Sequence, residues 1–260
     1  MKRGILYMLF FFILAGNSFP QVRVQVVSRE INKTIAWEEG MSLVVNGDNA
    51  EIYCSPGFHK DIGISMTIIS KHEERTVAEA DLEKMKWLVE VNDNACFVRN
   101  YIELSRNQAP PGSAMKVVIR ITVPANCPVS IHNYFGKTEI SGFNSGVNVS
   151  SEYGPVILSD LKGNTTVNSI FGDINIKGTL GHTRITSTHS QIILSLNTPD
   201  QYGFNLELTD SEIIKPEEMI IIYDKKEKGK ITGQIKGQSS GPEISIIVEN
   251  CSLTIEQSNN

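Results

Sequence analysis

The sequence predicts an all-β protein, a single-stranded parallel β-solenoid (β-helix) with right-handed coils of 18 residues. Two observations predict this fold. Apolar residues alternate with polar ones over short segments, and a ring followed by a small residue recurs between those segments. The recurrence has a spacing of 18 residues, at Phe135-Gly136, Tyr153-Gly154, Phe171-Gly172 and His189-Ser190. A fixed period of this size is typical of stacked repeats, and parallel crossovers are usually right-handed.

Four regular coils are predicted over residues 125–198, each with two short strands joined at the ring and small residue. In one coil the inward positions are Val147 and Val149 before this corner and Val156 and Leu158 after it. Two short strands are marginal alone, so stacked coils are expected to share a continuous aliphatic core. We expect the glycine at the corner to take a positive φ, because glycine does so without steric cost.

Residues 19–124 are rich in strands but lack the period, and we interpret them as the irregular N-terminal part of the solenoid with a cap. Ile62–Ile68 and Met115–Val123 alternate as strands do, Asn46–Asn49 predicts a turn, and Val77–Trp87 predicts one short helix. A cap is expected because the first coil would otherwise present an open strand edge.

Residues 199–260 are interpreted as irregular terminal coils. A fifth coil is expected near Phe204–Ile213 and a last coil near Ile244–Ile255. Between them, residues 215–243 break the period with the charged run Asp224–Lys230, which predicts an exposed hairpin or excursion.

Residues 1–18 predict a secretory signal peptide, in which Lys2 and Arg3 precede the apolar run Ile5–Ala15 and small residues follow up to Ser18. The run is about half of the ~20 residues that a membrane-spanning helix needs, and no later segment is long or apolar enough to span. The chain is therefore expected in the periplasm, on the cell surface or outside the cell, with no membrane span after signal cleavage. A retained membrane anchor is the alternative.

The cysteines Cys54, Cys96, Cys127 and Cys251 belong to a chain bound for an oxidising compartment. Their spacing matches no metal site, so no metal ligand is predicted. Three pairings are open. About five coils of roughly 4.8 Å each would separate Cys127 from Cys251, which excludes that bridge. Cys54 and Cys96 are the pair that neighbouring strands could bring together.

No motif points to catalysis or to a cofactor. The net charge of −5 comes without a basic cluster, which disfavours nucleic acid as a partner. Calcium-binding nonapeptide repeats need a carboxylate in each half-turn, and only Asp173 follows a corner glycine. Glu152 and Asp160 fall on different strands of one coil, and the outward positions show no column of acids for glycoside hydrolysis. We predict no catalytic residue, no cofactor-binding residue and no cofactor.

The column of rings at the corners is compatible with two interpretations. The rings of Phe135, Tyr153, Phe171 and His189 form either a sugar-binding stripe or a structural stack, and we favour the stack. Tyr134 is expected to be the more exposed ring. Projecting loops carry function more often than regular strands, which favours a binding site in the irregular N-terminal half or in Lys225–Lys230.

These motifs resemble a known family. Ile121–Gly136, followed by Ser151–Leu158 and Ser169–Ile176, looks like the bacterial putative-adhesin β-solenoid family, a domain family of unknown function, over about residues 37–255. The resemblance implies an exported, strand-rich chain and surface attachment, with no catalytic residue to carry over. The family's aspartate after the corner glycine is replaced in three coils, by Lys137, Pro155 and Gln191.

The sequence therefore predicts an exported, non-enzymatic β-solenoid, an adhesin-like module of the cell envelope or surface that binds a surface glycan or an envelope protein. The alternative is a periplasmic structural or regulatory domain that binds an envelope protein. A polysaccharide-active solenoid enzyme is the third hypothesis.

Overall fold

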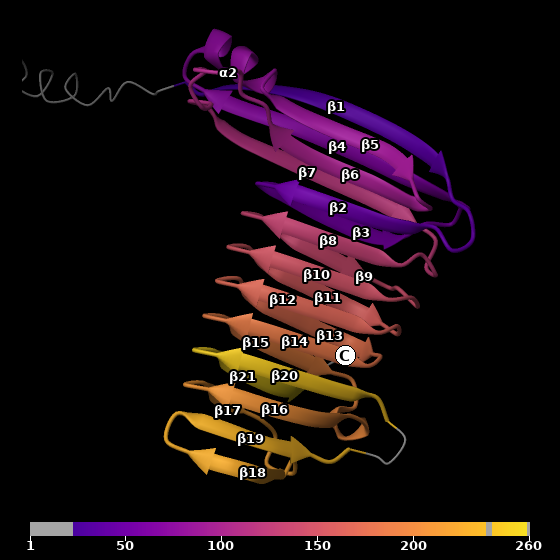
Figure 1. The fold of residues 1–260 in the computed structure, drawn as a ribbon, viewed down its shortest axis with the longest axis vertical. Helices are drawn as coiled ribbons and strands as arrows, with labels where there is room; N and C mark the ends of the chain where they lie inside the picture. Colours follow the sequence, from indigo (N-terminus) through magenta and orange to yellow (C-terminus); the bar gives the residue numbers. More distant parts are fainter. Residues whose placement is uncertain (1–22, 238–240, 259–260) are drawn as a thin grey trace, which may run out of the picture.

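The computed structural model describes residues 23–237 and 241–258. They form two β-sheets that pack face to face, and the strands of each sheet follow one another along the long axis of the molecule (Figure 1). The predicted signal peptide, residues 1–18, lies outside the described residues.

The first sheet, sheet A, has ten strands in the order β1 (Gln25–Ala36), β4 (Asp61–His72), β7 (Ala114–Val123), β3 (Ala50–Pro56), β9 (Thr138–Ser141), β11 (Val156–Leu161), β13 (Ile174–Leu180), β15 (Gln191–Leu196), β21 (Ser252–Gln257) and β17 (Glu212–Ile214). The second, sheet B, has eleven in the order β18 (Ile221–Glu227), β19 (Lys230–Ile235), β16 (Gly203–Thr209), β20 (Glu243–Glu249), β14 (Thr183–Thr188), β12 (Thr165–Ile170), β10 (Val147–Glu152), β8 (Val129–Tyr134), β2 (Ser42–Asp48), β6 (Ala95–Ile102) and β5 (Met85–Asn92). The described helices are α2 (Arg75–Leu82) and the short 3-10 helix η1 (Pro199–Gln201).

In the middle of the stack, residues 18 positions apart pair in parallel. Val147 pairs with Val129 on one side and with Thr165 on the other, and Val156 pairs with Ile174 in the facing sheet. Every second side chain points between the sheets, where the aliphatic residues of the regular strands are buried. The core is therefore a continuous layer between the two sheets, built by period-2 alternation.

The prediction of a single-stranded parallel β-solenoid is wrong, because both sheets are mixed. β1, β4 and β7 are antiparallel neighbours, as are β5 and β6. At the other end, β16, β19 and β18 are antiparallel as well. A solenoid coil crosses to the other sheet after each strand, whereas β5–β6 and β18–β19 turn back within one sheet, and such hairpins pair antiparallel. The fold consists of two large mixed sheets whose central strands are parallel.

Strand order also departs from chain order. β2 and β3 pair with β8 and β9, although residues 57–128 separate them in the chain. The C-terminal strands β20 and β21 lie between β14–β15 and β16–β17, so the segment expected to form the last coil is not at the end of the stack. The charged segment expected as a hairpin or excursion forms β18 and β19, which extend sheet B. Helix α2 is shorter than the predicted Val77–Trp87, because strand β5 begins at Met85.

The corners of the stack carry the positive φ on the ring and not on the glycine, so that expectation was wrong. The corner residues share φ values between 44° and 57°: Asn49, Phe135, Tyr153, Phe171, His189, Asp210 and Asn250. The glycine is required for a different reason. A Cβ on Gly154 would overlap the carbonyl oxygen of Gly136, and a Cβ on Gly172 would overlap that of Gly154. Backbones of successive corners approach too closely for a side chain there.

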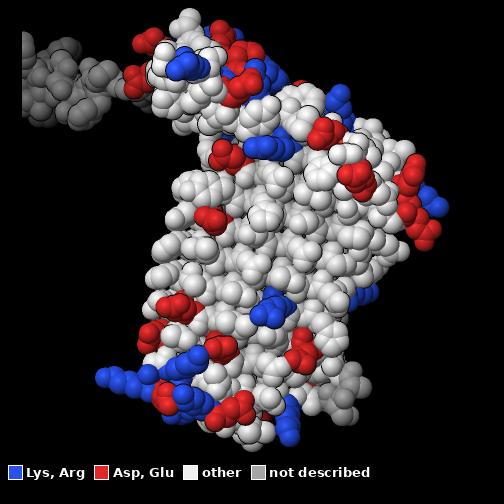
Figure 2. All heavy atoms as spheres, in the orientation of Figure 1, with Lys and Arg blue, Asp and Glu red and all other residues white. Residues whose placement is uncertain are grey.

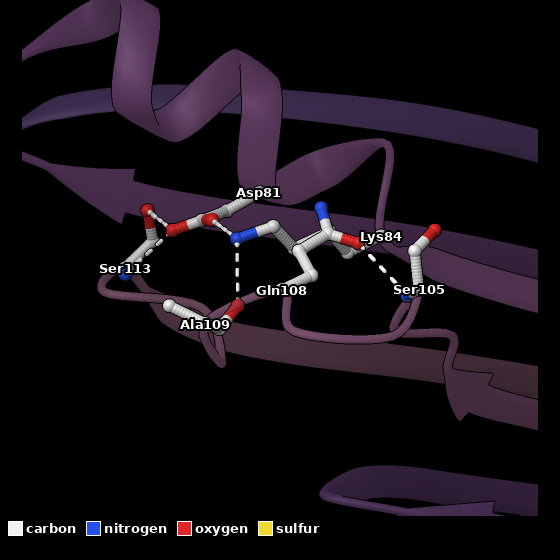
Figure 3. Close-up of polar contacts among 6 residues, drawn as sticks. All are labelled: Asp81, Lys84, Ser105, Gln108, Ala109 and Ser113. Atoms are coloured by element: carbon white, nitrogen blue, oxygen red, sulfur yellow. Dashed lines mark hydrogen bonds and ion pairs between the residues drawn. The ribbon is translucent and has the colours of Figure 1, made fainter.

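A buried ion pair holds the loop before β7 against helix α2. The Lys84 ammonium donates a hydrogen bond to Asp81 at 2.7 Å, and the backbone N–H and hydroxyl of Ser113 donate to the same carboxylate at 2.9 and 2.8 Å. Lys84 also donates to the carbonyl oxygen of Ala109 at 3.3 Å (Figure 3). Burial alone would raise the pKa of Asp81, but the hydrogen bonds from Lys84 and Ser113 outweigh it and lower the pKa to about 2.

Gly154→Ala should destabilise the protein by about 1 to 3 kcal/mol, the usual cost of overpacking, because the new methyl group meets the neighbouring backbone. Gly146→Ala is the matched control, since a Cβ there lies at an ordinary 3.7 Å from the carbonyl oxygen of Asn164. Urea unfolding measures both variants. Equal stabilities for the two would contradict the close approach at the corners.

Asp81→Asn should destabilise the protein by about 2 to 3 kcal/mol, because Lys84 is left as a nearly buried cation without its partner. Glu79→Gln is the control; its ion pair with Arg75 is exposed and should contribute less than about 0.5 kcal/mol.

A depressed carboxyl pKa such as that of Asp81 stabilises the fold above about pH 4, near the ordinary carboxyl pKa, and ceases to do so as the pH falls toward about 2. The difference in melting temperature between wild type and Asp81→Asn should therefore narrow over that interval. A difference independent of pH would mean that Asp81 is not held ionised by these contacts.

Candidate functional site

A pocket of about 420 Å³ lies on the outer face of sheet A, near its N-terminal end. Two adjacent rows of outward side chains form it, and each row crosses β1, β4, β7 and β3 in register. The first row is Asn32, Ser65, Arg120 and Tyr53; the second is Thr34, Gly63, Thr122 and Ser55. We call this site the Arg120 pocket.

Gly63 produces the hollow in the second row. Its neighbours in that row carry hydroxyl side chains, whereas Gly63 has no side chain and leaves a gap in the row between β1 and β7. A Cβ on Gly63 would lie 2.7 Å from Oγ1 of Thr122, closer than carbon and oxygen atoms pack. The absence of a side chain at this position therefore allows both the depression and the close packing of Thr122.

Arg120 supplies an uncompensated positive charge to this pocket. Its guanidinium lies 4.9 Å from the centre of the Tyr53 ring, and within residues 23–237 and 241–258 it forms no ion pair. The basic residues beside it are different: Lys116 pairs with Glu51 at 2.8 Å, and Lys137 pairs with Glu139 at 2.6 Å.

These two neighbouring ion pairs are reflected in pKa shifts. The hydrogen bond from Lys116 lowers the pKa of Glu51, and the hydrogen bond to Glu139 raises the pKa of Lys137. Both lysine charges are therefore engaged by carboxylates on the same sheet face, although the Lys137 ammonium also lies 5.0 Å from the Tyr53 ring centre. Among the described residues Arg120 has no carboxylate partner, and its guanidinium is stabilised by the ring of Tyr53.

The walls of the pocket offer neutral hydrogen-bonding groups. They are the amide of Asn32 and the hydroxyls of Thr34, Ser55, Ser65 and Thr122. The described lining residues include no aspartate or glutamate. Lys33 also borders the pocket, but its ammonium lies over the ring of Trp87, 5.6 Å from the ring centre. The pocket is thus a polar hollow with one guanidinium.

The ring column forms the structural stack that the sequence favoured. Ring centres of Phe135 and Tyr153 are 4.9 Å apart, those of Tyr153 and Phe171 5.5 Å, and those of Phe171 and His189 4.7 Å, all near parallel. Tyr134 contacts Phe135 and Tyr153 by its edge and is 44% exposed, no more than the rings of the column. Because the rings cover one another's faces, they present mainly edges to solvent. Sugars stack on ring faces, so this geometry favours a structural role.

Buried hydroxyl groups support the same corners from inside. Ser151 donates to the carbonyl oxygen of Gly154 at 3.1 Å, and Ser169 donates to that of Gly172 at 2.8 Å. In the first regular coil Asn133 takes this place and donates to the carbonyl oxygen of Gly136. Each polar side chain satisfies a carbonyl that the tight corner would otherwise leave without a donor. The column is therefore an integrated part of the fold.

The cysteines are all free and buried, so the suggested Cys54–Cys96 bridge does not form. Burial, together with nearby Cys127, raises the pKa of Cys54, and the same two causes raise that of Cys96 to about 11. Cys127 and Cys251 are four strand steps apart along sheet B, from β8 to β20, or about 19 Å at 4.8 Å per step. Buried thiols with a raised pKa, such as those of Cys54 and Cys96, are poor nucleophiles and poor metal ligands.

The other residues considered in the sequence do not gather into a site. Among the described residues no three His, Cys, Asp or Glu side chains lie together as metal ligands. Asp173 accepts a hydrogen bond from the backbone N–H of Gln191, and Lys225 pairs with Glu227 within the β18–β19 hairpin. No helix in the described part of the chain has the length and apolar character to cross a membrane.

Comparison with known proteins gives structural neighbours only. No family model matches the sequence, and no curated protein matches it. A solved "putative cell adhesion protein" from Clostridium sporogenes is 16% identical, with a TM-score of 0.47, over 89% of this chain and 100% of its own. A "putative lipid binding protein" from Parabacteroides distasonis is 12% identical, with a TM-score of 0.32, over 89% and 96%. A "putative adhesin" from Bacteroides fragilis is 14% identical, with a TM-score of 0.26, over 88% and 97%.

All four thiols should be unreactive toward an aromatic disulfide reagent in the folded protein and should react together when guanidinium unfolds it, because burial blocks access of the reagent. Lys177→Cys, at an exposed position of β13, is the control and should react at once. Recovery of only two thiols after unfolding without reductant would show that the other two cysteines form a disulfide and would contradict the structure, in which all four are free. Peptide mapping would then identify its partners.

Proposed function

We propose that the protein is an exported, non-enzymatic binding module, adhesin-like, and that it holds its ligand in the Arg120 pocket. The observation that carries this proposal is the exposed guanidinium of Arg120, which has no carboxylate partner in the described residues and lies among neutral hydrogen-bonding groups. A volume of about 420 Å³ falls in the range of ligand-binding pockets. In such a pocket, specificity usually comes from a small number of polar groups that converge on the ligand.

The rigidity of the surrounding strands supports this proposal. Arg120, Tyr53 and Ser65 come from three hydrogen-bonded strands whose inward neighbours are buried in the core. A binding group fixed on paired strands loses little conformational freedom when a ligand arrives. The proposed location on the cell surface or in the envelope fits a module that acts by contact.

A protein of the envelope is the second candidate partner, and the ring column favours it. Exposed apolar side chains gather there: Tyr134, Phe135, Tyr153, Ile170 and Phe171. On the face shown in Figure 2, charged residues lie mainly toward the two ends of the stack and few lie over its middle. Exposed apolar side chains that gather in one place suit a protein partner.

A glycan array with the purified protein tests the proposed function. Wild type should bind a subset of glycans, and Arg120→Gln should lose most of that binding at unchanged melting temperature, because it removes the charged donor without altering the core. Lys177→Gln, an exposed outward position on β13 of the same sheet, is the matched control and should bind normally.

Two results would count against this function. The first is the absence of binding to any glycan. The second is loss of binding in Phe171→Ser but not in Arg120→Gln, which would transfer the activity to the ring column and favour the protein-binding alternative.

A further inference from the structure

We infer that the group recognised by Arg120 is a carboxylate carried by a saccharide, as in a polyuronate chain. This inference rests on the proposed function and specifies its ligand class. Three properties of the Arg120 pocket support it: the number of uncompensated charges, the shape of the charged group, and the chemistry of the walls.

The charge in the pocket suits one singly charged anion. Lys116 and Lys137 are paired with Glu51 and Glu139, so neither adds a free charge on this face. The ammonium of Lys33 lies over Trp87 instead. Of the two cationic lining residues, Lys33 is thus drawn toward a ring outside the pocket, whereas Arg120 lies over Tyr53, which itself lines the pocket. A phosphate with nearly two negative charges usually meets several basic groups, whereas one guanidinium balances one carboxylate.

The shape of the cation suits a planar anion. A guanidinium offers parallel N–H groups that form two hydrogen bonds with one carboxylate. Tyr53 contributes by stacking: its ring lies 4.9 Å from the guanidinium carbon of Arg120 and restricts the orientations of that group. The Tyr53 hydroxyl lies 3.3 Å from Glu51 and donates to it. We therefore regard Tyr53 as a positioning residue for Arg120.

The walls suit the rest of a sugar ring. Hydroxyls of Thr34, Ser55, Ser65 and Thr122 and the amide of Asn32 can both donate and accept hydrogen bonds, as sugar hydroxyls do. None of the described lining residues is acidic, so a carboxylate meets no like charge in the pocket. The pocket lies on the sheet surface and extends from β3 to β1, the edge strand of sheet A, so a polymer could continue past this edge beyond one sugar.

The net charge of the whole chain, −5, argues that selectivity is local. A negatively charged protein does not attract polyanions over long distances, so affinity must come from contacts within the pocket. Salt also screens the attraction between an exposed guanidinium such as that of Arg120 and a bound carboxylate. Binding of an acidic saccharide should accordingly be salt-dependent and should require Arg120.

Calorimetric titration with oligogalacturonate tests this inference, with its methyl ester and dextran sulfate as comparison ligands. Wild type should bind the free acid at least about tenfold more tightly than the ester, the typical effect of a charge-assisted hydrogen bond. Arg120→Gln should bind both equally weakly. Arg120→Lys should retain part of the preference, because it keeps the charge and loses the planar fork.

Control variants separate positioning from stability. Tyr53→Phe keeps the ring and should bind as wild type does, whereas Tyr53→Ala should reduce the preference for the acid. Lys177→Gln should leave all affinities unchanged, and affinity for the acid should fall between about 0.05 M and about 0.5 M salt.

The outcomes distinguish this inference from the function on which it rests. Arg120-dependent binding of the ester or of another neutral glycan as tightly as the acid would overturn the carboxylate assignment and leave the binding function standing. Tighter binding of dextran sulfate than of the uronate would overturn it as well. Failure to bind any of these probes, together with an empty glycan array, would overturn both.

Discussion

Close contact between backbones at the corners determines the geometry of the stack. The N–H of Phe135 donates to the carbonyl oxygen of Glu152 at 3.0 Å, and the N–H of Tyr153 donates to that of Ile170 at 2.9 Å. These hydrogen bonds place successive corners one strand spacing apart. Register then follows, because a slip of one residue would turn every buried aliphatic side chain toward water. Stacked rings, buried hydroxyls and the requirement for glycine all result from this spacing.

The regular middle of the fold was predictable because each repeat shows the same alternation of apolar and polar residues and the same ring at the corner. Val147, Val149, Val156 and Leu158 occupy the inward positions that alternation assigned to them, and all are buried. The ends were not predictable in this way. Strand β4 alternates as cleanly as any regular strand, but alternation shows which face of the sheet a residue occupies and not whether the neighbouring strand is parallel. Pairing at both ends is decided by tertiary contacts between segments far apart in the chain.

The candidate site shows the same limit. Alternation over Met115–Val123 already implied that Arg120 points outward, and the clean pattern at Ile62–Ile68 implied the same for Gly63 and Ser65. No linear motif joins these positions to Asn32 or Tyr53, because the row exists only after four strands have been ordered as β1, β4, β7 and β3. The sequence favoured the irregular N-terminal half or Lys225–Lys230 as the place for a site, but the individual residues of the Arg120 pocket could be named only once the strand register was known.

The position of the C-terminal strands has a consequence for how the chain folds. β20 and β21 separate β14–β15 from β16–β17, although they follow both pairs in the chain. Until β20 and β21 have docked, β16–β17 lacks the parallel partner that it has in the folded protein, and the edge of β14–β15 is open to it. Both segments alternate with the same period, so β16–β17 is a competitor for that edge. Folding of this end can therefore pass through a misordered intermediate, and correct assembly requires β20 and β21 to dock between the two pairs.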